Sequence, residues 1–142
     1  MRKYCCTLYC LIMLFCSCHG DFNDIGNGYV FSNGEIVKRI RGGGNGYFPF
    51  EPLIPNQVLS YNYDSRYIVA YQIPEKEWLE FKKSYVSKEV ADSLQILYNN
   101  MVNIHHCYWI VCKKDGNIYG PLNKNKYMLM CDSLDCHLSL NL

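Results

Sequence analysis

The stretch from residue 107 to residue 122 constrains the fold of this chain more than any other. It begins with the apolar run Cys107–Cys112, continues through a charged turn that contains Asp115-Gly116, and ends with a second run that reaches Leu122. Aromatic and β-branched residues around an Asp-Gly turn predict a β-hairpin. Alternate residues of a strand point to opposite faces, and both faces of the first run are apolar. We therefore expect an inner strand with other elements packed on each side.

Two further hairpins are predicted upstream. Asn33-Gly34 separates two strand-like runs and favours a two-residue type I′ turn, because both residues tolerate positive φ. A turn at residues 64–66 separates two tyrosine-rich runs and predicts the second hairpin. Between the hairpins, residues 41–46 are rich in glycine, which is typical of a surface loop. Residues 47–55 carry three prolines and should run extended along a sheet edge, because proline lacks a ladder donor.

Three segments have helical periodicity. Pro74 opens the first, Ser87 can cap the second and Asn123 can cap the third. The apolar residues expected to face the core are Trp78, Phe81 and Tyr85 in the first, Val90, Leu94, Leu97 and Met101 in the second, and Tyr127, Met130, Cys131 and Leu134 in the third. The sequence thus predicts a single α+β domain, residues 28–142, with a hairpin-rich antiparallel sheet and two or three helices packed on one face. Residues 137–142 alternate strictly and predict a terminal strand.

The N-terminus has the features of a secretory leader. A short basic start precedes an apolar run that is too short to cross a bilayer, so residues 1–17 are predicted to be a signal peptide. The end of this leader resembles the lipobox of bacterial lipoproteins, with Phe15 where that motif usually has leucine. The resemblance implies cleavage before Cys18, lipidation of the Cys18 thiol, and a tether over residues 18–27. An ordinary cleaved signal without a lipid is the alternative.

The motifs together resemble a known family. They are the lipobox-like leader, the Gly-Tyr strand pair, the hairpin Tyr-Asp-Ser-Arg-Tyr-Ile-Val-Ala, and the segment Tyr-Trp-Ile-Val…Lys-Lys-Asp-Gly-Asn-Ile-Tyr-Gly-Pro-Leu followed by a helix. This pattern is similar to a family of short bacterial lipoproteins catalogued only as a domain of unknown function. The closing helix departs from the family pattern by carrying Met128, Met130 and Cys131. The resemblance implies a location in the bacterial cell envelope and a small α+β domain, and it implies no catalytic residues.

Four cysteines of the mature chain form two C-x4-C pairs, Cys107 with Cys112 and Cys131 with Cys136. Residues five apart on a strand face opposite sides, so the first pair cannot easily bind one ion, and we predict no metal and no cofactor. All four are candidates for disulfides in an exported protein, or they stay buried thiols. Cys131 and Cys136 can be joined only if the helix ends between them, because ideal helical spacing separates their Cα atoms too far.

The 13 tyrosines are an unusual feature of the composition. Four of them alternate along the second hairpin: Tyr61, Tyr63, Tyr67 and Tyr71. They could form a cross-strand aromatic cluster under the helices. Alternatively, they form an exposed platform for a sugar ring or a protein partner.

The formal net charge of +1 argues against a nucleic-acid partner. The mature sequence contains no nucleophile elbow, H-E-x-x-H helix or phosphate loop. The preferred hypothesis is a non-catalytic binding or structural lipoprotein, whose partners are the membrane and an envelope protein or glycan. The alternative is a small envelope hydrolase with a site built from distant residues, such as His105 and Asp64. An enzyme should show a pocket where at least two polar groups of perturbed pKa converge.

Overall fold

The computed structural model describes residues 22–39, 50–55 and 57–142. The predicted cleavage and lipidation site at Cys18 and the glycine-rich patch at residues 41–46 lie outside these residues.

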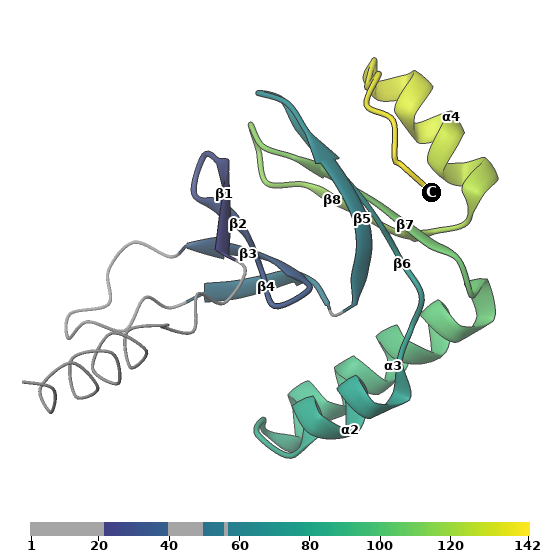
Figure 1. Ribbon diagram of the computed structural model, residues 1–142. Coiled ribbons are helices and arrows are strands. Elements are labelled where there is room, and N and C mark those ends of the chain that lie inside the picture. The colour runs from purple at the N-terminus through teal and green to yellow at the C-terminus, as the bar shows by residue number, and fades with distance from the viewer. Residues whose placement is uncertain (1–21, 40–49, 56) are drawn as a thin grey trace, which may run out of the picture.

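The described residues form two antiparallel four-stranded sheets (Figure 1). The first sheet consists of β1 (Phe22–Gly26), β2 (Tyr29–Ser32), β3 (Glu35–Arg39) and β4 (Phe50–Ile54), in that order. The second sheet consists of β5 (Val58–Tyr63), β6 (Tyr67–Gln72), β7 (Cys107–Cys112) and β8 (Ile118–Leu122), in that order. The predicted α+β class with hairpin-rich antiparallel pairing is confirmed, but the strands are divided between two sheets instead of one.

The predicted turns have the expected backbone. Asn33 and Gly34 both have positive φ, 50° and 76°, as a type I′ turn between β2 and β3 requires. Gly116, in the turn between β7 and β8, has a φ of 77°. Among the described strands, the proline-containing β4 pairs only with β3 and therefore lies at a sheet edge, as predicted.

Strand β7 is the inner strand that its apolar run predicts. It pairs with β6 on one side and β8 on the other. Trp109 and Val111 belong to a cluster that includes residues of the first sheet, whereas Tyr108 and Ile110 belong to a second cluster with Tyr127. The second sheet is thus the middle layer of the molecule and is buried on both faces.

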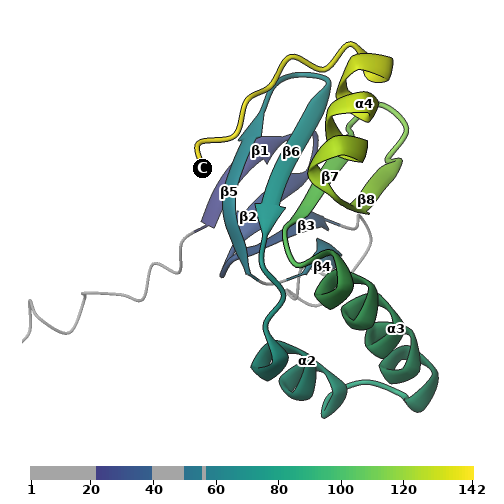
Figure 2. The same cartoon turned by 90° about the vertical axis from the view of Figure 1, so that its right-hand side faces the viewer.

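The described residues contain three helices, α2 (Lys76–Lys83), α3 (Lys88–Ile104) and α4 (Lys124–Leu134). Helix α4 covers the outer face of the second sheet, and the first sheet covers the opposite face (Figures 1 and 2). Helices α2 and α3 pack on each other below the sheets (Figure 2). The expectation that all helices share one sheet face is therefore wrong, because the first sheet occupies the remaining apolar face.

Three local predictions also need correction. Residues 22–26 belong to strand β1, with Ile25 buried, so the tether predicted over residues 18–27 does not extend that far. Phe81 and Tyr85 are 60% and 75% exposed, because the short helix α2 buries Trp78 and Leu79 instead.

Residues 137–142 do not form the predicted strand. Leu138 and Leu140 pack against the cluster under α4, and the carbonyl of Ser139 accepts a hydrogen bond from Asn62 Nδ2 at 2.9 Å. The alternating leucines therefore cover an apolar face and do not extend the ladder.

Candidate functional site

Lys113 is the one charged side chain that is buried among the described residues, with 8% of its surface exposed. It directly follows β7, and the alternation of that strand continues the face of Trp109 and Val111 into the space between the sheets. Its backbone N–H donates to the carbonyl of Arg66 at 2.8 Å, which ties this end of β7 to the β5–β6 turn. The fold therefore holds an ammonium group at the junction of the two sheets.

The Lys113 ammonium links segments that are distant in sequence. Its Nζ donates to the carbonyl of Ile25 in β1 and to the carbonyl of Asp64 at 2.6 Å. It also lies 5.0 Å from the centre of the Tyr63 ring, within the range of a cation–π interaction. Two of its three N–H groups are thus used to hold the first sheet against the tip of the β5–β6 hairpin.

Asp64 is fixed by the turn that it begins. Its Oδ1 accepts hydrogen bonds from the backbone N–H groups of Arg66 and Tyr67, both at 2.7 Å. Burial alone would raise the pKa of Asp64, but these hydrogen bonds and the charges of Arg66 and Lys113 outweigh it, so the pKa lies below its ordinary value. Asp64 is therefore an ionised carboxylate that is already hydrogen-bonded by its own loop.

The pKa of Lys113 is lowered, chiefly because burial disfavours its charged form. The carboxylates of Asp64 and Asp24 oppose this effect. Asp24 lies in strand β1, where its Oδ1 accepts from the Gly26 N–H at 2.9 Å and its Oδ2 lies 3.5 Å from Arg39 Nη1. Two carboxylates and one ammonium thus converge at the same end of the molecule.

These groups line a pocket of about 420 Å³ between the end of β1 and the β5–β6 turn, which we name the Lys113 pocket. Its walls are Asp24, Ile25, Gly26, Asn27, Tyr63, Asp64, Ser65 and Lys113. Asn27 and Ser65 are exposed, and Tyr63 keeps 40% of its surface exposed. The pocket can therefore offer a ligand an aromatic ring, an amide, a hydroxyl and carboxylate oxygens.

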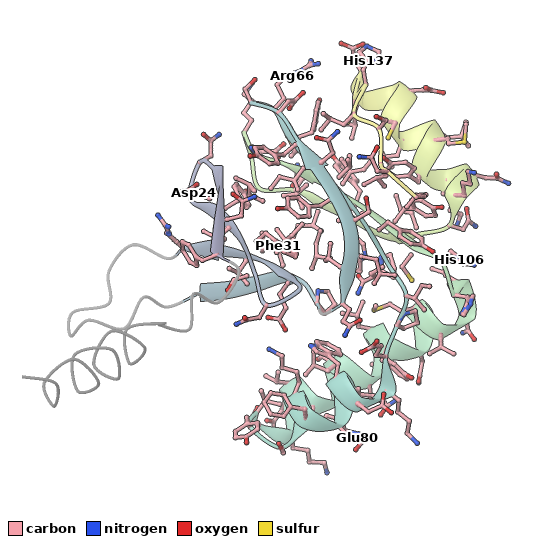
Figure 3. All side chains as sticks on the ribbon, viewed as in Figure 1. Asp24, Phe31, Arg66, Glu80, His106 and His137 are labelled. Atoms are coloured by element: carbon pink, nitrogen blue, oxygen red, sulfur yellow. The ribbon has the colours of Figure 1, made fainter. Side chains whose placement is uncertain are left out.

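The four tyrosines predicted as one cluster or platform lie on both faces of the second sheet. Tyr61 stacks on Phe31 of the first sheet at 4.5 Å, and Figure 3 places Phe31 between the sheets. Tyr63 stacks on Tyr61 at 6.4 Å and reaches the Lys113 pocket. Tyr67 is buried and Tyr71 is half-buried on the face that α4 covers. The four do not share one face of the sheet, because Tyr61 packs with Ala70 in the cluster between the sheets, whereas Tyr67 and Tyr71 belong to the cluster under α4.

The four cysteines also separate by face. Cys107 is fully buried and its thiol donates to the carbonyl of Met101 at 3.4 Å, and burial raises its pKa to about 11. Cys112 lies in the other cluster, so the prediction that β7 turns these two thiols to opposite faces is confirmed. Cys131 and Cys136 share the cluster of Cys112. All four are free thiols in this structure.

The distant pair suggested for a hydrolase, His105 with Asp64, is not formed. His105 ends α3 next to the start of β7, which pairs with the end of β6 at Gln72, whereas Asp64 precedes the start of β6. They lie at opposite ends of the same strand pair. Over the described ranges, no three His, Cys, Asp or Glu side chains gather as a metal site, and no helix is long and apolar enough to cross a membrane.

Sequence reasoning missed Lys113 as the centre of a site. The residue continues the alternation of Cys107, Trp109 and Val111 by one step, so its position on the core-facing side was available as a signal. The partners Ile25 and Asp64 carried no such signal, because they lie 88 and 49 residues away in the chain.

No curated protein and no solved structure matches this chain. A family model does match, over residues 29–142, which include every strand and helix described above except β1. The expected resemblance to an uncharacterised family is thereby confirmed, while the lipoprotein and bacterial aspects stay predictions. The chain belongs to the family described as "Protein of unknown function (DUF3997)".

Proposed function

We propose that this protein is a non-catalytic lipoprotein of the bacterial cell envelope, tethered through Cys18, that binds a saccharide of an envelope glycan in the Lys113 pocket. The observation that carries the proposal is the combination of an exposed aromatic ring, Tyr63, with carboxylate, amide and hydroxyl groups around one pocket. A sugar presents an apolar C–H face and a rim of hydroxyl groups, which such a pocket complements.

The hydrogen bonds of the pocket favour binding over catalysis. Lys113 already donates to two backbone carbonyls, and Asp64 already accepts from two backbone N–H groups. A general base or nucleophile needs a free lone pair directed at the substrate. The perturbed pKa values of both groups are the observation that favours a hydrolase as the second candidate.

Binding can be tested by calorimetric titration of the purified protein with soluble peptidoglycan fragments and with amino-sugar disaccharides. We expect saturable binding that weakens by about tenfold in Tyr63→Ala, which corresponds to about 1.4 kcal/mol. Tyr85→Ala is the matched control, since Tyr85 is exposed at the far end of α2. Absence of binding, or equal loss in both variants, would contradict the proposal. Hydrolysis of a fragment that disappears in Lys113→Met would favour the enzyme.

The anchor can be tested separately by intact-mass measurement of membrane-extracted protein. We expect a chain that starts at Cys18 and carries added acyl chains, and a Cys18→Ser variant that is released from the membrane. Cys16→Ser is the matched control and should stay anchored. A mature chain without acyl chains would refute lipidation and leave the pocket proposal standing.

A further inference from the structure

Cys131 and Cys136 lie on either side of the end of α4. The helix ends at Leu134, and Asp135 adopts a left-handed conformation with φ 52° and ψ 43°. The N–H of Cys136 donates to the carbonyl of Cys131 at 2.9 Å, and the N–H of Asp135 donates to the carbonyl of Asp132 at 3.3 Å. This pair of bonds is a Schellman motif, in which the side chains at the positions of the two cysteines frequently contact each other.

The two thiols share one environment. Both belong to the apolar cluster between α4 and the second sheet, with Cys136 5% exposed and Cys131 half-buried. Burial is the largest cause that raises the pKa of the Cys131 thiol, and the Cys136 thiol contributes to the same shift. The condition for joining them, that the helix ends between them, is therefore met.

We propose that Cys131 and Cys136 form a disulfide in the exported protein, by exchange with a small-molecule or protein disulfide. The more accessible Cys131 thiolate attacks the external disulfide, forms a mixed disulfide and releases one external thiol. Cys136 then attacks the Cys131 sulfur and releases the second external thiol. The two cysteine thiols are oxidised, the external disulfide is reduced to two thiols, and the two protons pass to those thiols.

The other C-x4-C pair is an internal control with the same spacing. Cys107 and Cys112 lie on opposite faces of β7, one in each apolar cluster. A disulfide needs Cβ atoms that point toward each other, so this pair cannot close in the folded protein. Selectivity for Cys131 and Cys136 therefore depends on the fold and not on spacing in the sequence.

The disulfide would fix the helix end that holds the β5–β6 turn. Tyr67 donates its hydroxyl proton to the carbonyl of Leu134 at 2.7 Å, and Arg66 Nη2 donates to the carbonyl of Asp135 at 3.0 Å. Figure 3 shows Arg66 and His137 at the same end of the molecule. The same turn carries Asp64 and Ser65 of the Lys113 pocket, so the cross-link supports one wall of that pocket.

The test uses the full chain, reduced and then incubated with oxidised glutathione, either folded or in urea. Free thiols are alkylated, and the chain is cut before aspartate, which separates the two cysteines at Asp132 and Asp135. In the folded protein we expect the fragment that ends at Cys131 to stay joined to the fragment that contains Cys136. Cys107 and Cys112 should both be alkylated. In urea the disulfides Cys107–Cys112 and Cys131–Cys136 should form to equal extents. Burial raises the pKa of the Cys131 thiol, so folded-state oxidation should be faster at higher pH.

Variants make the outcome decisive. Cys131→Ser and Cys136→Ser should each abolish the joined fragments, whereas Cys112→Ser should leave them unchanged, with circular dichroism confirming that each variant is folded. The proposal would be overturned if Cys131 and Cys136 were still free, and therefore alkylated, after oxidation of the folded protein. A link from Cys136 to Cys112, or equal closure of Cys107 with Cys112 in the folded state, would overturn it as well.

Discussion

Replacing Lys113 with methionine tests whether the buried ammonium holds the two sheets together. Methionine keeps most of the apolar stem but leaves the carbonyls of Ile25 and Asp64 without their donor. An unpaired buried acceptor costs about 1–3 kcal/mol. Two effects reduce the sum: water in the pocket can reach the Asp64 carbonyl, and methionine removes the cost of burying a charge. We therefore expect a net loss of about 2–3 kcal/mol in the free energy of unfolding.

The assay is urea denaturation followed by tryptophan fluorescence, to which Trp78 and Trp109 both contribute, together with thermal unfolding. A loss of this size should lower the thermal midpoint by roughly 10 °C in a chain of this length. Lys114→Met is the matched control, because Lys114 is the exposed neighbour and should change stability by no more than about 0.5 kcal/mol. Equal stability of the two variants would refute the structural role assigned to Lys113.

Substitutions at three further positions have expected outcomes. Gly116→Val should lower the free energy of unfolding by about 1–3 kcal/mol, because the φ of Gly116 is 77°. Gly116→Asn should cost less, because asparagine tolerates that backbone region. Equal denaturation midpoints for the two variants would show that valine is not strained in this turn. Gly120→Ala should cost about 1–3 kcal/mol, since its Cβ would lie 2.6 Å from Cδ2 of Trp109, and an unchanged midpoint would contradict this close approach. The pKa of Asp64 is lowered in the folded state, so its stabilisation is full above the unfolded value of about 3.9 and is lost as pH falls through the folded value. Asp64→Asn should therefore flatten the acid side of the stability profile, and parallel profiles would refute this.

Local chemistry alone determined the predicted turns, most of the strands and the starts of α3 and α4, which follow Ser87 and Asn123. Asn33-Gly34 and Gly116 adopt positive φ because few other residues do so without strain. Asn123 caps α4 by accepting from the Lys126 N–H at 2.9 Å, as its residue type and position predict. The alternation of β7 also determined that Cys107 and Cys112 face opposite sides. These features depend on residues that are close in sequence.

The helical spacing of apolar residues predicted less accurately which side chains are buried. Phe81 and Tyr85 have helical spacing with Trp78, yet only Trp78 finds a partner across the fold, where its Nε1 donates to Glu35 at 3.1 Å. A periodic pattern marks a face that can be buried, and it does not say which element will cover it.

Only the tertiary structure decided that the strands divide into two sheets and that a pocket forms where they meet. An apolar strand face is satisfied equally by a helix or by another sheet, so the sequence of β7 could not distinguish α4 from the first sheet as its cover. The Lys113 pocket depends on this stacking of the two sheets. Stacking of the sheets brings the carbonyls of Ile25 and Asp64 to the Lys113 ammonium across 88 and 49 residues of chain, and no local preference encodes contacts over such separations.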